Sequence, residues 1–258
     1  QAKFSRPTAI TNSFLPMKPG TRYIYEGTAV EDDGKVVPHR IEINITDLIK
    51  EIGGVRNAVS YDLDYSDNEL VEIELAFFAQ DDEGNVWHFG QYPEEYEDGK
   101  FIKAPAWIHG NESACAGISM KAQPGPGAPS YSQGYGPSVG WIDRGQTYQV
   151  GQQVTIGLGR YEDVLVIKET ARSEGDAAQL KWYARGIGNI KVGWMGSEEK
   201  TKEVLELVRV EQLGPQALAE VRAKALALEK RAYQRAKGAY GSTPPMIIPP
   251  DAASRRVN

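Results

Sequence analysis

Alternation of apolar and polar residues at every second position is the strongest constraint that this sequence places on its fold. Ile41, Ile43 and Ile45 share one face of an extended chain, and the residues between them are polar. The alternation continues through the segments around Tyr61 and Ile73. Because successive side chains of a strand point to opposite faces, the pattern predicts β-strands with one apolar and one solvated face.

Short turn sequences separate these segments at nearly even spacing over the first hundred residues. Most of them contain Asp-Gly or Gly-Gly pairs, which adopt the positive φ angles of tight hairpins. They lie at residues 31–34, 52–54, 66–68, 81–85 and 97–99. Neighbouring strands joined in this way form an up-and-down antiparallel meander.

A second group of strands is expected at residues 164–167, 180–185, 190–194 and 204–210. About ten strands in meander order could close on themselves, which would remove exposed sheet edges. We therefore predict a mainly β fold for residues 1–213, an antiparallel up-and-down meander that forms a barrel or half-barrel.

Residues 122–140 interrupt the meander with a Gly- and Pro-rich stretch that has no periodicity. Long loops in compact domains are usually lids, binding loops or linkers. Aromatic residues in and near the loop could stack on a sugar ring or line an apolar pocket. We predict these as the ligand-binding residues: Trp87, Trp107, Tyr131, Tyr135 and Trp141. Aromatic packing beneath the loop is the alternative reading.

The last part of the chain, residues 214–258, has a different pattern. Pro215 is placed as at a helix start, and apolar residues recur every three or four positions up to Ala236. A Pro-rich segment from Pro244 favours an extended tail that lies in a groove or along a sheet edge. We predict an amphipathic C-terminal helix followed by this tail.

Charge is divided unevenly between these two parts. The chain carries a net charge of −6, but residues 215–258 carry +5 and residues 1–214 carry −11. We expect the basic helix to dock on the acidic body of its own chain or of a neighbouring subunit, which would allow a homo-oligomer through residues 214–258. An acidic patch at residues 94–98 is one candidate receiving surface. The acidic body argues against nucleic acid as a partner.

The sequence also excludes several function classes. It has no run of about 18 apolar residues, as a transmembrane helix would need, and no phosphate-binding glycine loop, dinucleotide fingerprint or serine-nucleophile elbow. Cys115 is the only cysteine, so no intramolecular disulfide can form. A buried thiol is expected there; a nucleophile would need a base, and His109 is the only nearby candidate.

Two metal sites can be considered. His39, His88 and His109 are the only histidines, and three imidazoles can hold zinc or copper. Asp81, with the acids and Asn85 that follow it in one turn, could offer oxygen ligands to calcium, but side chains that cap a hairpin explain this turn equally well. No cofactor is predicted; zinc, copper and calcium are alternatives.

Several segments together resemble a family of exported bacterial proteins that begin with a "YFPLKPGTTWVYEG"-like stretch after the signal peptide. The resemblance covers roughly residues 12–195. It rests on residues 14–27, 79–90, 96–100, 131–135, 161–166 and 182–188. His88 departs from the family pattern, in which an aromatic residue is usual. The resemblance implies a β-rich exported protein and supplies no catalytic residues.

These observations lead to one preferred function and one alternative. The polar start at Gln1 favours a mature chain that has lost a signal peptide, secreted to the periplasm or the cell exterior. We predict a non-enzymatic binding or assembly protein that holds an apolar or sugar-like ligand near the long loop. The alternative is a secreted enzyme, either metal-dependent through the histidines or carbohydrate-active through carboxylates near the aromatic cluster.

Overall fold

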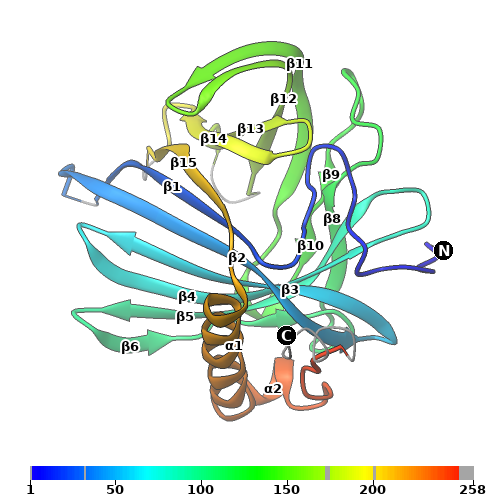
Figure 1. The fold of residues 1–258 in the computed structure, drawn as a ribbon. Helices are drawn as coiled ribbons and strands as arrows, with labels where there is room; N and C mark the ends of the chain where they lie inside the picture. Colours follow the sequence, from blue (N-terminus) through cyan, green and yellow to red (C-terminus); the bar gives the residue numbers. More distant parts are fainter. Residues whose placement is uncertain (1, 32, 172–174, 200–201, 250–258) are drawn as a thin grey trace.

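A computed structural model describes residues 2–31, 33–171, 175–199 and 202–249. Over these residues, fifteen strands form one strongly curved antiparallel sheet in the order β10-β8-β5-β4-β3-β2-β1-β15-β14-β13-β12-β11-β9 (Figure 1). Two short strands, β6 and β7, pair with β5 outside this order. The mainly β prediction, a barrel-like meander with a C-terminal helix, is confirmed.

The first half of the sheet is a hairpin meander, and the second half follows the long loop. The strands of the first half are β1 (Thr21–Val30), β2 (Val36–Ile52), β3 (Val55–Ser66), β4 (Glu69–Gln80), β5 (Val86–Glu97), β6 (Lys100–Lys103), β7 (Trp107–Ile108) and β8 (Cys115–Met120). Those that follow are β9 (Tyr131–Ser132), β10 (Gly134–Tyr135), β11 (Arg144–Ile156), β12 (Gly159–Thr170), β13 (Ala178–Ala184), β14 (Gly188–Met195) and β15 (Val204–Gln212). The last strand pairs with the first, which brings the two halves together.

The two ends of the sheet meet at the segment Tyr131–Tyr135. Its first part, β9, pairs with β11, and its second part, β10, pairs with β8, so one short segment bridges both ends. The predicted loop 122–140 is therefore an ordered connection that nearly closes the barrel. Trp107 is completely buried beneath it and packs against Gly134 and Gly136, where a Cβ atom would lie 2.5 and 2.6 Å from the indole ring.

The apolar residues of neighbouring strands do not all face the same side. Ile41, Ile43 and Ile45 of β2 face the barrel interior, whereas Val59 of β3 and Phe77 of β4 face outward and join the core beneath the helix. The prediction of one apolar and one solvated face is therefore wrong. Both faces of β3 and β4 are covered, the outer by the helix and the inner by the far wall of the barrel.

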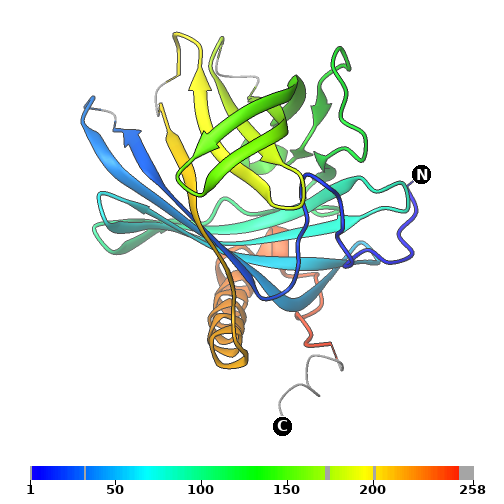
Figure 2. The ribbon, with the colours of Figure 1, turned by 45° about the horizontal axis from the view of Figure 1, so that its top comes forward.

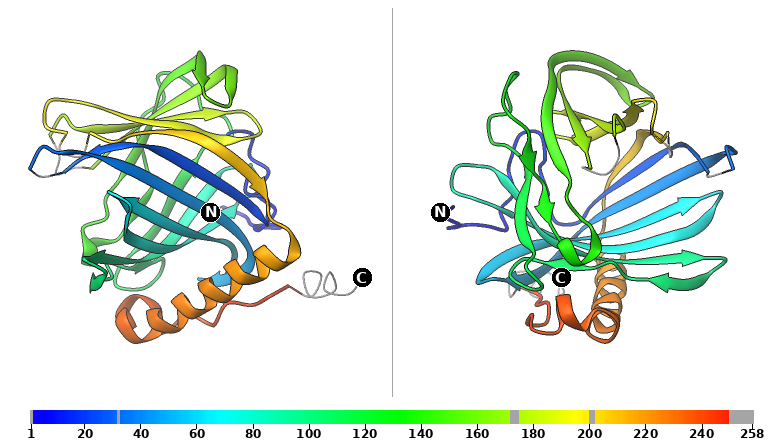
Figure 3. Two further views of the ribbon diagram at one scale, coloured as in Figure 1. Left: turned by 60° about the vertical axis from the view of Figure 1, so that its left-hand side comes forward. Right: turned by 180° about the vertical axis from the view of Figure 1, so that it is seen from behind.

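Helix α1 (Pro215–Arg235) lies across the outer face of β2 and β4, followed by the short α2 (Lys237–Tyr240) (Figures 2 and 3). Its apolar stripe is buried against the sheet through Val221, Ala225, Leu228 and Ala232. Beyond α2, Ile247 exchanges two backbone hydrogen bonds with Ile49, on the part of β2 that extends past β1. The tail thus pairs along a free strand edge; its last residues, 250–258, lie outside the described residues.

Candidate functional site

The barrel holds a cavity of about 520 Å³ that is partly open to solvent. Its walls come from β1 to β5 on one side and from β12 to β15 on the other, and the N-terminal segment Leu15–Met17 covers one end. That segment is fixed from both halves: Asn12 donates hydrogen bonds to the Gly84 and Lys121 carbonyls, and the Gly186 amide donates to the Ser13 carbonyl. The volume lies within the range of about 300–1,000 Å³ typical of small-molecule sites.

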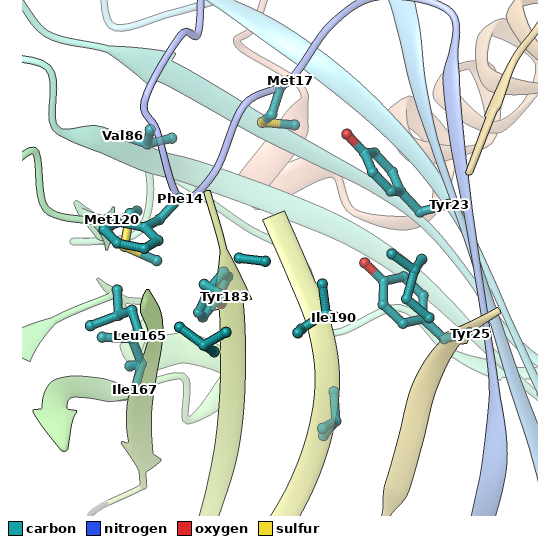
Figure 4. Close-up of a cluster of buried hydrophobic side chains, with 14 of the residues drawn as sticks. Phe14, Met17, Tyr23, Tyr25, Val86, Met120, Leu165, Ile167, Tyr183 and Ile190 are labelled. Atoms are coloured by element: carbon teal, nitrogen blue, oxygen red, sulfur yellow. The ribbon is translucent and has the colours of Figure 1, made fainter. Parts of the chain in front are cut away.

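One part of the cavity wall is apolar and aromatic. Tyr23 and Tyr25 project from β1 toward the strand that carries Ile190 (Figure 4). The Tyr25 hydroxyl donates a 3.0 Å hydrogen bond to the Asn189 carbonyl, which fixes that ring. The remaining apolar lining includes Met17, Ile41, Ile43, Ile45, Val192 and Leu205.

Another part of the wall is acidic. Within the described residues, six carboxyl side chains line the cavity: Asp62, Asp64, Glu74, Asp143, Glu169 and Glu203. Lys181 is the one lysine in the same wall. Carboxylates cost free energy when removed from water unless they are paired or hydrogen-bonded, so the partners of each one decide what this wall can do.

Two of these carboxylates hold His39, which is 8% exposed. Its Nε2 lies 2.6 Å from Asp64 Oδ1, and its Nδ1 lies 3.1 Å from Glu203 Oε1. Burial alone lowers the pKa of His39, but the two carboxylates outweigh it and raise this pKa to about 10. Gln179 also donates a 2.5 Å hydrogen bond to Glu203. His39 is therefore an imidazolium that lies between the carboxyl groups of Asp64 and Glu203.

Lys181 neutralises a third carboxylate. Its ammonium lies 2.6 Å from Glu169 Oε2, and Gln133 donates a 2.7 Å hydrogen bond to the other oxygen of Glu169. Burial lowers the pKa of Lys181, yet the charge of Glu169 more than offsets this and the pKa is raised overall. Because Gln133 sits between β9 and β10, this pair also ties the closing segment to the barrel wall.

Asp62 and Glu74 form no ion pair with any cation in the part of the chain that the structure describes. Asp62 Oδ2 accepts a 3.1 Å hydrogen bond from Ser60, but Oδ1 is shielded from solvent and accepts none among the described residues. Burial raises the pKa of Asp62 to about 7. Burial, followed by the charges of Glu72 and Asp62, also raises the pKa of Glu74 well above its ordinary value. These two acids therefore retain their protons to a higher pH than an ordinary carboxyl group does.

His88 lies at the edge of the cavity with its ring stacked on Phe78 at 5.0 Å and packed edge-on against Trp107 at 4.9 Å. Burial lowers its pKa to about 4, so the ring is neutral near pH 7. Alternation along β5 turns His88 away from Trp87 and Phe89, and those two rings belong to the outer core, the apolar cluster between the sheet and α1.

The five aromatic residues predicted to bind a ligand do not form one site. Trp107 is fully buried and stacks on Trp141, with 6.0 Å between ring centroids. Trp87 lies on the outer face against Phe4, Tyr131 packs over Gly145, and Tyr135 is exposed. Only Trp141 of this set lines the cavity.

The structure also does not bring the three histidines together. His39 lies in the acidic wall, His88 lies among the aromatic rings, and His109 packs on Phe89 of the outer core. Among the described residues no three His, Cys, Asp or Glu side chains are grouped to hold a metal ion. The Asp81 carboxylate accepts backbone hydrogen bonds from Glu83 and Asn85, so it caps its hairpin.

Cys115 is exposed, in contrast to the buried thiol that the sequence suggests. The nearest candidate base is occupied elsewhere: His109 Nδ1 accepts a 3.1 Å hydrogen bond from the Ala116 amide. The Cys115 thiol contacts the Ser113 carbonyl oxygen at 3.9 Å instead. This arrangement does not resemble an activated nucleophile.

Ion pairs attach the C-terminal helix to the body of the same chain. Arg231 and Arg235 both contact the buried Glu94 carboxylate, at 2.9 and 3.0 Å, and Arg222 pairs with Asp47. The acidic segment 94–98 thus contributes Glu94 to the surface that receives the helix. Since the apolar stripe is occupied within the chain, contact with a neighbouring subunit would have to use the exposed side of the helix, with Lys224 and Lys230.

Sequence reasoning missed the acidic wall. Asp62, Asp64 and Glu74 alternate with apolar residues, which is also the pattern of a solvated strand face. The available signal was the apolar run on the opposite side of β3 and β4: a second element had to cover it, and the apolar stripe of the C-terminal helix was the candidate. Glu169 and Glu203 come from distant strands, and only the barrel geometry places them in the same wall.

No family model matches the sequence, and no curated protein matches it. No helix among the described residues is both long and apolar enough to cross a membrane.

Two solved structures are similar to part of this chain. One is a Bacteroides fragilis protein with a YmcC-like fold that is taken to be exported. It is 12% identical in sequence to this chain, and the match covers 78% of this chain and 99% of that one, with a TM-score of 0.44. A protein of Parabacteroides distasonis taken to be a lipoprotein is 11% identical over the same shares, with a TM-score of 0.33.

Proposed function

We propose that this protein is a non-catalytic binding protein that holds a small molecule with an apolar body inside its barrel. The observation that carries the proposal is the cavity of about 520 Å³, with Tyr23, Ile43 and Leu205 in its wall. A concave space of this size, with an apolar wall and a few convergent polar groups, is typical of small-molecule sites. We therefore take the cavity to be the site where the ligand binds.

We further propose that the protein acts in the periplasm or outside the cell. The support is the resemblance of residues 12–195 to exported bacterial proteins. Fractionation of the native organism with an antibody against the chain tests this location. Recovery in the cytoplasmic fraction alone would overturn it.

The binding proposal is tested with N-phenyl-1-naphthylamine, a neutral apolar fluorophore. Ala76 of β4 is buried and points into the cavity, so Ala76→Phe fills part of the space. Ala223→Phe makes the same change on the exposed face of α1 and serves as the matched control. We expect saturable binding of one probe per chain that Ala76→Phe weakens at least tenfold and Ala223→Phe leaves unchanged. Absence of saturable binding, or equal binding by both variants, would contradict the proposal.

A catalytic function is the second candidate, because acids with raised pKa values in a cavity are typical of general acids. Asp62 and Glu74 lie opposite each other on β3 and β4 and meet this description. Hydrolysis of a panel of nitrophenyl glycosides, abolished by Glu74→Gln, would favour a carbohydrate-active enzyme. No turnover by the wild-type protein would leave binding as the function.

A further inference from the structure

The charges in the cavity wall do not balance once the pairs are assigned. Asp64 and Glu203 are paired with His39, and Glu169 is paired with Lys181. Asp62 Oδ2 accepts a hydrogen bond from Ser60 and the carboxyl group lies beside the Asn44 amide, but Oδ1 accepts no hydrogen bond from the residues that the structure describes. Glu74 makes no hydrogen bond or ion pair among the described residues. The wall therefore contains two neighbouring carboxyl groups with unused acceptor oxygens.

These two acids stand at the boundary with the apolar wall. Asp62 pairs across the ladder with Ile43 on one side and with Glu74 on the other. Ile43 belongs to the apolar lining that Tyr23 and Tyr25 continue. A ligand group that reaches Asp62 and Glu74 would therefore have its apolar remainder beside Ile43.

We propose that the ligand is a primary amine with an apolar body, whose ammonium group is bound by the carboxylates of Asp62 and Glu74. This inference rests on the proposed binding function and names the class of ligand. An ammonium group offers three N–H donors and no acceptor, and it needs carboxylate oxygens that are not already used. Asp62 Oδ1 and the two oxygens of Glu74 supply them.

The amine class is favoured over a metal ion and over an anionic ligand. A metal ion would need a further His, Cys or carboxylate ligand, and no such group of three is present among the described residues. An anionic ligand would face six carboxyl groups against two cations, Lys181 and His39, both of which are already paired with carboxylates of the wall. A cationic group is the ligand charge that matches the unpaired acceptor oxygens of Asp62 and Glu74.

Binding of the amine should release protons. The two strands that carry the acids also supply neighbours: β3 brings Ser60 and Asp64, and β4 brings Glu72. The Asn44 amide of β2 faces Asp62, and Lys181 of β13 faces Glu74. The other titratable groups in or beside the wall are His39, His88, Asp143, Glu169 and Glu203. Lys181 opposes the proton on Glu74, but burial and the neighbouring acids outweigh it. Because an ammonium group favours the ionised acids, affinity should rise with pH from 5.5 to 8.5, a range in which an alkylamine stays protonated.

The test compares three probes of equal length, octylammonium, 1-octanol and octanoate, by calorimetric titration at pH 8. We expect octylammonium to bind at least tenfold more tightly than octanol, and octanoate to bind most weakly. In Asp62→Asn/Glu74→Gln, the ratio of octylammonium to octanol affinity should fall close to one. The control Glu51→Gln/Glu97→Gln changes two exposed acids by the same total charge and should keep the ratio.

The outcomes separate this inference from the function on which it rests. If octanol binds as tightly as octylammonium, the binding function stands and the amine inference fails. If none of the three probes binds, both fail. Should the cavity variant not fold, the wild-type protein still decides: octylammonium affinity that rises at least fivefold from pH 5.5 to 8.5, with proton release, supports the inference, and an affinity that is flat or falls overturns it.

Discussion

Asp62 of β3 and Glu74 of β4 lie directly opposite each other in the antiparallel ladder, and both side chains face the barrel cavity. Like charges opposite each other destabilise a sheet. The raised pKa values of Asp62 and Glu74 favour their protonated forms, which reduces this cost. The same pair that weakens the scaffold is the part of the cavity best suited to a cation.

The first prediction concerns stability and pH. The pKa of Asp62 and that of Glu72 are both raised to about 7, so at these two sites the folded chain binds more protons than the unfolded chain from about pH 4 to pH 7. These two groups outweigh His88, whose pKa is lowered to about 4 and which acts in the opposite direction up to about pH 6.5. The pKa of His39, raised to about 10 from 6.5, acts in the same direction from pH 6.5 to 10. The free energy of unfolding, measured with urea, should therefore be higher at pH 5 than at pH 8.

Asp62→Asn should flatten this dependence, because the amide does not titrate. A free energy of unfolding that increases from pH 5 to pH 8 in the wild-type protein would contradict the assignment of protonated interior acids.

A second prediction separates the histidines by their ring signals in nuclear magnetic resonance. With a pKa of about 10, His39 should stay protonated from pH 5 to pH 8, and His88, with a pKa of about 4, should stay neutral over the same range. Neither set of ring shifts should move through a midpoint near 6.5, the ordinary value for His. A normal titration of His39 would show that Asp64 and Glu203 do not hold it.

A third prediction concerns the fully buried ammonium of Lys50, which contacts Glu229 at 2.7 Å and the Pro244 carbonyl at 2.7 Å. Removing one partner of a buried ion pair leaves the other charge uncompensated. Lys50→Met should therefore lower the free energy of unfolding by about 3–5 kcal/mol. Lys224→Met, on the exposed side of α1, should change it by less than about 0.5 kcal/mol.

The double variant Lys50→Met/Glu229→Gln distinguishes charge from packing. It should recover part of the stability, since no unpaired charge remains. An equal loss in the single and double variants would mean that the lysine acts through its packing alone.

The closing segment of the barrel gives a fourth prediction. A Cβ atom on Gly136 would lie 2.6 Å from the Trp107 ring, which is fully buried. Gly136→Ala should cost about 1–3 kcal/mol by overpacking. Gly157→Ala meets no atom within 4 Å and has no left-handed backbone, so it is the matched control in the same thermal melts. Equal melting temperatures for the two variants would argue against tight closure.

Much of the fold follows from the sequence. Two-residue alternation and the turn pairs predict the meander, and the spacing from Pro215 predicts a helix that begins where α1 begins. Closure of the meander by pairing of β1 with β15 agrees with the predicted barrel, but the sequence does not show that the ends of the sheet lie at β9 and β10 instead. Nor does it show the pairing of Ile247 with Ile49, which depends on how far β2 extends past β1.

The site was harder to predict than the fold. Alternation places Asp62 and Val59 on opposite faces but does not say which face is solvated, because burial depends on what the rest of the chain lays over each face. The aromatic residues near the long loop were chosen for their chemistry, yet Trp107 fills the core under Gly134 and Gly136. Large aromatic side chains near a loop are as useful for closing a barrel as for binding.

The most direct test of the central claim is a crystal structure of the protein with N-phenyl-1-naphthylamine at saturating concentration. The binding proposal predicts electron density for one probe inside the barrel, in contact with Tyr23 and Ile43 and within reach of Asp62. A probe bound only on the outer surface, with the cavity holding ordered water, would contradict it.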